Sequence, residues 1–249
     1  MTTLTINNLK IGAGKPKVCV PITAATSDEV IAEGSKLLTT SADLVLLRLD
    51  YLENIKDADK TIQTIQTLRH WTTGLPLIVD LRTKASGANI ALSDEDIQSV
   101  LIQIITAKVA DAIKIDDRLD PKIQNRIKNA ANNNQIRIIT AHYYLMQRPT
   151  KDQMVDKIDQ LEQTKLSDLV EISTIPTNKE QVLDLMQACL TASRNQSHPI
   201  IITAVGPLGK TIQLASVACN NSIIYEPLKD ANYLGQYSIT QLSKMNKML

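Results

Sequence analysis

The chain has 249 residues, 43% of them hydrophobic, which is enough to bury the core of one large domain or two small ones. Its 27 basic and 26 acidic residues leave a net charge of +1 without a long basic tract, so nucleic acid and anionic membranes are not expected partners. No apolar run approaches the roughly 18 residues of a membrane span, and the N-terminus MTTLTINNLK has no signal-peptide core. We expect a cytoplasmic protein with a small-molecule partner.

Two patterns alternate along the chain after an N-terminal segment, LTINNLKIGAGKPK, that predicts a β-hairpin over residues 4 to 15. Short runs of β-branched and aliphatic residues predict eight strands, which in chain order are KVCVPI, DLVLLRLD, LPLIVDLR, DAIKID, IRIITAH, DLVEIS, PIIITAV and SIIYEP. The intervening segments carry apolar residues at helical spacing, as at Ile97, Leu101 and Ile105. Eight βα units without a linker predict an α/β fold with a single domain over residues 1–249, a (βα)8 TIM barrel preceded by a hairpin.

The three cysteines, Cys19, Cys189 and Cys219, are widely spaced and form no CxxC or Cys/His cluster. Neither a disulfide framework nor a zinc site is therefore indicated. We expect buried thiols and no metal.

Alternation within each strand predicts which side chains face the barrel lumen. In the second strand the apolar residues Val45 and Leu47 suit the helix layer, which leaves Leu46 and Arg48 inside. The same reasoning places further polar residues inside, namely Asp80, Arg82, Lys114, Asp116, Thr140, His142, Glu171, Ser173 and Thr203. They lie toward the C-terminal strand ends, where barrel enzymes carry their active sites. A network of paired charges without any reaction is the alternative interpretation.

Six segments in this order resemble the type I 3-dehydroquinate dehydratases: LTINNLKIGAGKPKVCVPI, ADLVLLRLDYLE, PLIVDLRTKASG, IITAHYY, DLVEISTIP and YLGQYS. The resemblance covers essentially the whole chain. It implies a (βα)8 barrel of the shikimate pathway, commonly a homodimer, without metal or cofactor. It also implies a lyase in which a lysine forms a Schiff base with the substrate ketone, a histidine relays protons, arginines hold the carboxylate, and a loop after the eighth strand closes over the ligand.

Carried over residue by residue, the resemblance implies an altered site. Arg48, Arg82, His142 and Gln236 match the family's pattern, which assigns an acid/base role to His142 and substrate contacts to the others. Several family residues are replaced: two glutamates by Leu46 and Ser86, an aspartate by Tyr143, a carboxylate-binding arginine by Gln213, and the serine of the closing loop by Asn232. The Schiff-base lysine is replaced by Glu171, whose carboxylate cannot form an imine. Gln213 and Asn232 remain candidate substrate contacts.

Lys114 stands where the family usually has an aspartate, so the charges of two strands are exchanged. One interpretation is a buried ion pair between Lys114 and Glu171, since either charge alone would have a desolvation cost of about several kcal/mol. The other is a relocated nucleophile, because burial lowers the pKa of an amine. The adjacent carboxylate argues against the second interpretation.

His142 admits two interpretations as well. It is either a satisfied structural histidine or an acid/base and ligand-contacting group in the polar lumen. A general acid or base contributes about 10²- to 10⁴-fold to a rate.

The segment AVGPLGKT, Ala204 to Thr211, fits a relaxed phosphate-loop pattern. Only 38 residues follow it, too few for the rest of a nucleotide-hydrolase sheet. Phosphate binding at a barrel loop remains an alternative, in which Lys210 contacts the anion.

The leading functional hypothesis is a family-like protein that lacks the Schiff-base dehydratase activity. It is either a pseudoenzyme that binds a small carboxylated or polyhydroxylated metabolite, or a barrel that acts on another substrate. The first alternative is an active dehydratase that uses Lys114 or a non-covalent mechanism. The second is a phosphate-binding barrel.

Overall fold

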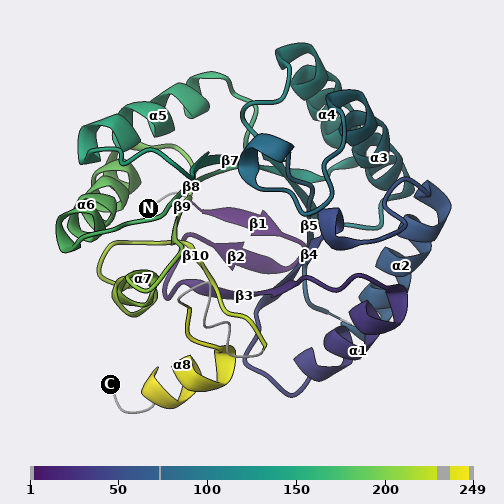
Figure 1. Cartoon of the computed structure of the whole chain (residues 1–249), viewed down its shortest axis with the longest axis horizontal. Helices are drawn as coiled ribbons and strands as arrows, with labels where there is room; N and C mark the ends of the chain where they lie inside the picture. The colour runs from purple at the N-terminus through teal and green to yellow at the C-terminus, as the bar shows by residue number, and fades with distance from the viewer. Residues whose placement is uncertain (1–2, 73, 229–235, 247–249) are drawn as a thin grey trace.

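The computed structural model describes residues 3–72, 74–228 and 236–246, and its centre is a barrel of eight parallel strands (Figure 1). The strands are β3 (Lys17–Ile22), β4 (Leu44–Arg48), β5 (Leu77–Asp80), β6 (Ala112–Asp116), β7 (Arg137–Tyr144), β8 (Leu169–Thr174), β9 (Ile200–Ala204) and β10 (Ile223–Tyr225). Their order in the sheet is β10-β3-β4-β5-β6-β7-β8-β9. The predicted (βα)8 barrel is confirmed, and each strand coincides with an expected segment.

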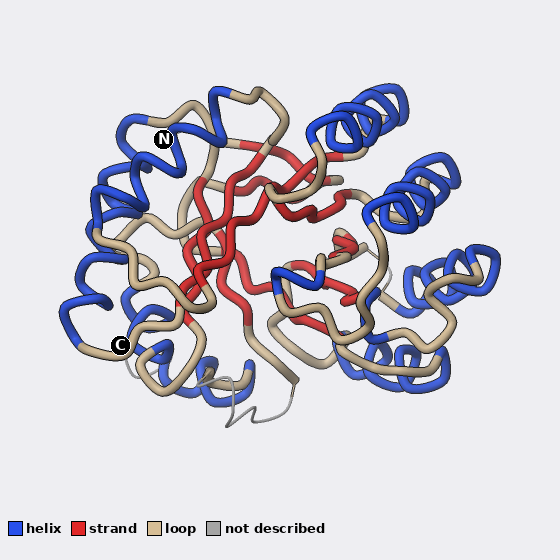
Figure 2. Tube along the Cα trace, turned by 45° about the horizontal axis from the view of Figure 1, so that its top comes forward, coloured by secondary structure: helices blue, strands red, loops and turns tan. Residues whose placement is uncertain are grey.

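Helices surround the strands on the outside, as the blue and red tubes of Figure 2 show. They are α1 (Ser27–Leu37), α2 (Ala58–Trp71), α3 (Asp94–Ala107), α4 (Pro121–Asn134), α5 (Lys151–Gln163), α6 (Lys179–Asn195), α7 (Gly209–Ala215) and α8 (Ile239–Asn246). Two short 3-10 turns, η1 (Leu49–Tyr51) and η2 (Lys84–Ser86), follow β4 and β5. The main core lies between the layers, where outward strand residues such as Val45 and Leu47 pack with helix residues such as Ile65 and Leu68.

The predicted N-terminal hairpin is present as β1 (Leu4–Ile6) and β2 (Leu9–Ile11), which pair antiparallel. Ile6 and Ile11 are fully buried and pack with Leu44, Leu169 and Ile223, each the first residue of its strand. Figure 1 shows the two strands lying across the ring of the barrel. The hairpin therefore covers the N-terminal end of the lumen and leaves the C-terminal end for a site.

The barrel closes where β9 meets β10. The Ser222 amide donates to the Ile200 carbonyl at 3.0 Å. The buried Asn221 side chain accepts from the Ile202 amide at 3.0 Å and donates to the Ile202 carbonyl at 3.1 Å. The Asn221 side chain thus pairs with backbone groups of β9 that have no strand partner at this position.

Strand register fixes which residues share the lumen. Arg48 is opposite Asp80, Asp80 is opposite Lys114, and Ser173 is opposite Thr203. On β7, however, Ala141 is opposite Glu171 and Tyr143 is opposite Ser173. Since partners in a parallel ladder point to the same face, Tyr143 faces the lumen and the expected inward placement of Thr140 and His142 is wrong.

Candidate ligand-binding site in the barrel

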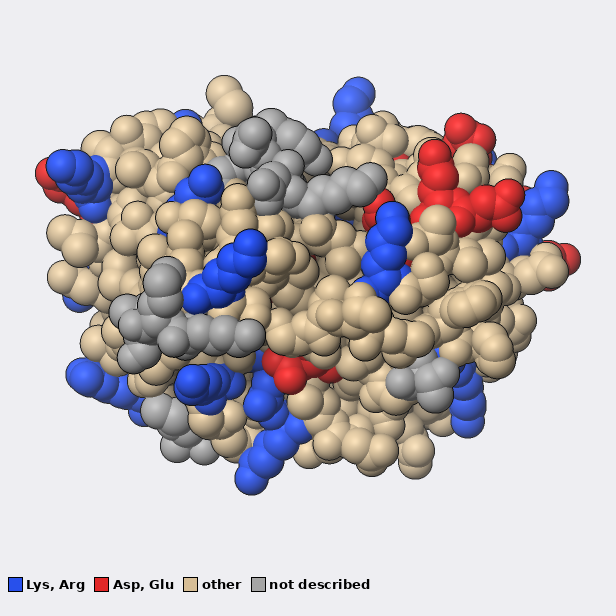
Figure 3. All heavy atoms as spheres, turned by 90° about the horizontal axis from the view of Figure 1, so that it is seen from below, with Lys and Arg blue, Asp and Glu red and all other residues tan. Residues whose placement is uncertain are grey.

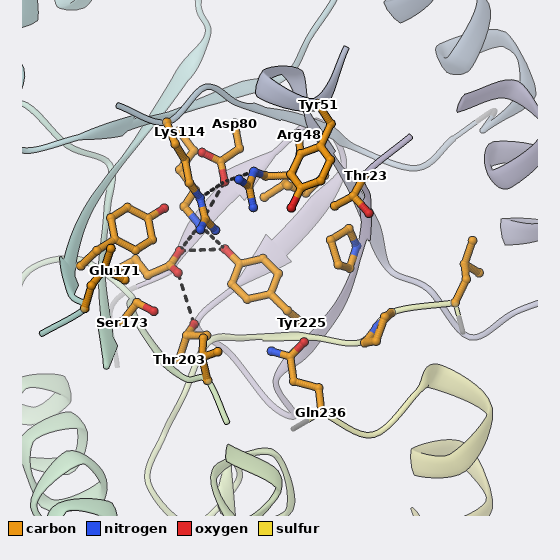
Figure 4. Close-up of a pocket in the computed structure, with 18 of the residues that line it drawn as sticks. Thr23, Arg48, Tyr51, Asp80, Lys114, Glu171, Ser173, Thr203, Tyr225 and Gln236 are labelled. Carbon is orange, nitrogen blue, oxygen red and sulfur yellow. Dashed lines mark hydrogen bonds and ion pairs between the residues drawn. The ribbon is translucent and has the colours of Figure 1, made fainter. Parts of the chain in front are cut away.

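A cavity of about 390 Å³ opens at the C-terminal ends of the strands (Figure 4). Each of the eight barrel strands, or the segment directly after it, contributes to its wall. The polar residues that line it are Thr23, Glu33, Arg48, Tyr51, Asp80, Arg82, Lys114, Tyr143, Glu171, Ser173, Thr203, Tyr225 and Gln236. Of the predicted site residues, Arg48, Arg82, Lys114, Glu171 and Gln236 are therefore brought together.

Lys114 and Glu171 form an ion pair at the bottom of this cavity. The Lys114 Nζ lies 2.7 Å from Glu171 Oε2 and 3.7 Å from Asp80 Oδ2. Both Lys114 and Glu171 are 1% exposed. Burial by itself lowers the pKa of Lys114, but the charge of Glu171, with Tyr143 and Asp80 behind it, raises the pKa above its ordinary value. The predicted ion pair is confirmed, and Lys114 is an ammonium ion at neutral pH.

Glu171 is held by more than the lysine. Tyr225 Oη donates to Glu171 Oε2 at 2.8 Å, and Thr203 Oγ1 donates to Glu171 Oε1 at 3.2 Å. Lys114 also donates to Tyr225 Oη at 3.3 Å. These four side chains come from β6, β8, β9 and β10, and Figure 4 shows them pointing toward one another. Both oxygens of the carboxylate are therefore hydrogen-bonded inside the protein.

The two arginines bind acidic side chains of their own strand ends. Arg48 donates two hydrogen bonds of 2.8 Å to Asp50, and Arg82 Nε donates to Asp80 at 3.3 Å. Burial works to raise the pKa of Asp80, yet the cations Lys114, Arg82 and Arg48 outweigh it and lower the pKa. Three cations thus face three carboxylates, and the charges of this network balance.

Tyr143 takes the inward position of β7. Its ring lies under the Arg82 guanidinium, with the Arg82 Cζ 4.6 Å from the ring centroid. The buried Tyr143 hydroxyl has no hydrogen-bond partner in the described part of the chain. Burial raises the pKa of this phenol to about 12, against the lowering effect of Arg82. The inward place on β7 that was expected for His142 is therefore taken by Tyr143, whose phenol is neutral at physiological pH.

His142 lies outside the lumen instead. Its Nδ1 is 2.9 Å from Asp117, which also binds Lys157 at 3.0 Å, and its ring packs edge-on against Tyr144. The prediction that His142 shares the lumen with the arginines and Glu171 is wrong. Asp117 and Lys157 lie on the outward side at the end of β7, so the His142 side chain finds a hydrogen-bond partner there without entering the lumen.

The remaining predicted residues have other positions. Gln213 does not line the cavity, because its amide donates to the backbone carbonyls of Tyr225 and Tyr237 and accepts from the Tyr237 amide. Lys210 lies over the Tyr237 ring at 4.7 Å. Asn232 and most of the expected closing loop lie outside the described residues.

Three backbone amides of the segment Ala204 to Thr211 are occupied within the protein. The amides of Val205, Gly209 and Thr211 donate to the carbonyls of Thr174, Gly206 and Leu208. These N–H groups are therefore not directed at a ligand.

Figure 3 shows lysine and arginine side chains scattered over the displayed face, separated by uncharged surface. No helix within the described ranges is long and apolar enough to cross a membrane. Among the same residues, no group of three or more His, Cys, Asp or Glu side chains is arranged to hold a metal ion.

Residues 18–249 match the family model of the type I 3-dehydroquinases. The chain belongs to the type I 3-dehydroquinase family. Two curated relatives are the 3-dehydroquinate dehydratases of Clostridium botulinum and Enterococcus faecalis, each 26% identical. These alignments span 98% and 97% of this chain, respectively, and 96% of each relative.

Solved 3-dehydroquinate dehydratase structures have the same fold. The Clostridium difficile enzyme, crystallised with covalently modified comenic acid, superposes with a TM-score of 0.94 at 22% identity, over 100% of this chain and 98% of its own. The enzyme from Geobacillus kaustophilus gives a TM-score of 0.93 at 21% identity, over 100% and 96%. The cavity therefore lies in the barrel that this family shares.

Sequence reasoning missed two members of the network, Tyr225 and the inward Tyr143. Tyr225 has a usable signal, because Ile224 suits the helix layer and alternation then turns Ile223 and Tyr225 inward. Tyr143 has no such signal. On β7 both faces carry an isoleucine and a tyrosine, so polarity alone does not set the phase.

Proposed function

We propose that this member of the type I 3-dehydroquinase family binds a small carboxylate in its barrel and does not dehydrate 3-dehydroquinate through an imine. The observation that carries the proposal is the buried 2.7 Å ion pair of Lys114 with Glu171. Glu171 occupies the position to which the sequence resemblance assigns the Schiff-base lysine. Among the described residues that line the cavity, the one lysine is the residue that this glutamate neutralises.

Imine formation needs a neutral amine with a free lone pair. Lys114 donates to Glu171 and Tyr225 and has a raised pKa, so its neutral form is scarce at physiological pH. Deprotonating it would also leave Glu171 as a buried charge without a cation partner. Both effects oppose nucleophilic attack on a ketone.

Carboxylate binding is supported by the donors that remain in the cavity. The terminal nitrogens of Arg82 make no hydrogen bond to the described residues, and its side chain is 23% exposed. Ser173 and Gln236 line the same cavity (Figure 4). A charge-assisted hydrogen bond contributes about 1.5 to 3 kcal/mol, so a carboxylate at Arg82 gains from it even though the charges of the surrounding network balance.

The test of the chemistry is incubation of the purified protein with 3-dehydroquinate and borohydride, followed by mass spectrometry. The Enterococcus faecalis relative serves as the positive control. We expect no adduct and no enone absorbance from this chain. An adduct on Lys114 would refute the proposal and establish the alternative of a dehydratase with a relocated nucleophile, and enone formation without an adduct would establish a non-covalent dehydratase.

The test of binding is calorimetry with small carboxylates on the wild type and on Arg82→Gln. We expect heat with the wild type and about a tenfold or greater loss of affinity in the variant. Equal affinities in the two proteins would refute the assigned ligand contact.

The homodimer and the cytoplasmic location expected from the sequence stay predictions. Light scattering of the purified protein and fractionation of the source cell would test them.

A further inference from the structure

The carboxylates at the floor of the cavity are already engaged by donors of the protein. Both oxygens of Glu171 accept from protein donors, namely Thr203 on one side and Lys114 and Tyr225 on the other. Asp80 is surrounded by Arg48, Arg82 and Lys114. The floor is thus rich in donors and offers few free acceptors to a ligand.

Part of the wall above this floor is apolar and lies beside the polar residues Thr23, Ser173 and Gln236. Six lining residues have no polar side-chain atom: Pro21, Leu46, Leu145, Val205, Pro227 and Leu228. Tyr51, Tyr143 and Tyr225 add aromatic rings. Leu46 is 2% exposed, lies two residues before Arg48 on the same face of β4, and lines the same cavity.

A ligand hydroxyl that faces the apolar part of the wall finds no acceptor there. It loses its hydrogen bonds to water, and a polar group buried without a partner costs about 1–3 kcal/mol. A ring carbon without a hydroxyl has no such cost and gains from contact with the apolar wall. A carboxylate, which only accepts, is matched by Arg82.

We propose that the cavity selects a hydrophobic ring carboxylate, with few or no hydroxyl groups, over a polyhydroxylated one. This inference rests on the proposed carboxylate-binding function and names its ligand class. The volume of about 390 Å³ falls in the range of roughly 300–1,000 Å³ that small-molecule sites occupy. A substituted six-membered ring fits this space.

The experiment compares ligands that differ only in hydroxyl groups. Cyclohexanecarboxylate and quinate share a six-membered ring and one carboxylate, and quinate adds four hydroxyl groups. Calorimetry on the wild type is expected to give cyclohexanecarboxylate about tenfold or greater affinity over quinate. Benzoate, a planar ring carboxylate without hydroxyls, is expected to have an affinity similar to that of cyclohexanecarboxylate.

A matched pair of variants tests the cause. Leu46→Gln places an acceptor oxygen on the cavity wall and is expected to move the affinity ratio about tenfold toward quinate, whereas Leu46→Met keeps the wall apolar and leaves the ratio unchanged. The wild-type comparison decides the question even if Leu46→Gln does not fold.

The outcomes separate this inference from the proposed function. Quinate binding as tightly as cyclohexanecarboxylate, or more tightly, with affinity lost in Arg82→Gln, overturns the ligand class and leaves carboxylate binding in place. Absence of heat with all three ligands overturns both. An unchanged ratio in a folded Leu46→Gln variant overturns the assignment of selectivity to the apolar wall.

Discussion

Removing Lys114 alone tests whether the interior of the barrel depends on paired charges. In Lys114→Met the Glu171 carboxylate keeps only Tyr225 and Thr203, two neutral donors, in a site that is 1% exposed. Asp80 loses a cation as well. Breaking a buried pair by removing one partner costs about 3–5 kcal/mol, and for a chain of this size each kcal/mol lowers Tm by about 2–4 °C. The expected loss in Tm is therefore roughly 6–20 °C.

The double substitution Lys114→Met with Glu171→Leu removes both charges and is expected to recover most of this loss. Urea unfolding of the wild type, the two single variants and the double variant gives the coupling free energy. The matched control is Lys56→Met, because Lys56 pairs with Asp96 at 3.5 Å but its side chain is 71% exposed, so the change should cost at most about 1 kcal/mol. A double variant that loses the sum of the single losses would refute the coupling, and with it the assignment of a stranded charge.

Three further predictions concern groups outside the ion pair. Burial, and to a lesser extent the charge of Asp43, raises the pKa of Glu226 from 4.5 to about 8, so the stability that protonated Glu226 contributes is complete below pH 4.5 and is lost as pH rises through about 8. Glu226→Gln should therefore unfold at a higher temperature than the wild type at pH 9 and at a similar temperature at pH 4. Parallel pH profiles of the two proteins would contradict this. Asn221→Ala leaves two buried backbone groups of β9 unpaired and should lower the free energy of unfolding by about 2–4 kcal/mol. The control Asn133→Ala changes an exposed side chain and should alter the free energy of unfolding by less than about 0.5 kcal/mol. Equal losses in urea unfolding would refute the role of Asn221 in closing the barrel. Tyr143→Phe removes a hydroxyl without a partner among the described residues and should leave urea stability unchanged or raise it by about 1 kcal/mol; a clear loss of stability would show that the hydroxyl is bonded.

The fold was predictable because one strand-and-helix pattern repeats along the whole chain. Alternation of strand and helix patterns indicated eight units, and apolar outward residues such as Val45 and Leu47 set the phase of β4 correctly. The Lys114–Glu171 pair followed from two opposite charges at inward positions, since neither is stable there alone.

The errors in the site have one physical origin, which is that a side chain's surroundings come from other strands and helices. His142 is satisfied on the outward side by Asp117, a residue beyond the end of β6, and no local pattern in β7 indicates this. The Gln213 side chain donates hydrogen bonds to the backbone carbonyls of Tyr225 and Tyr237. The sequence of the helix that contains Gln213 does not indicate these partners. Alternation gives the face of a residue, and only the assembled barrel gives its partner.

The balanced interior also restricts how this lineage can change. Glu171→Lys alone would place two ammonium groups side by side at the bottom of the barrel, and Lys114→Asp alone would crowd a further carboxylate against Asp80 and Glu171 without enough cations. Each single step passes through a destabilised protein, because a buried charge without its partner costs several kcal/mol, more than about a third of the total stability of many domains. A return to the lysine that the family resemblance assigns to position 171 therefore requires both substitutions together, or prior stabilisation elsewhere, and the same constraint applies to an exchange in the opposite direction.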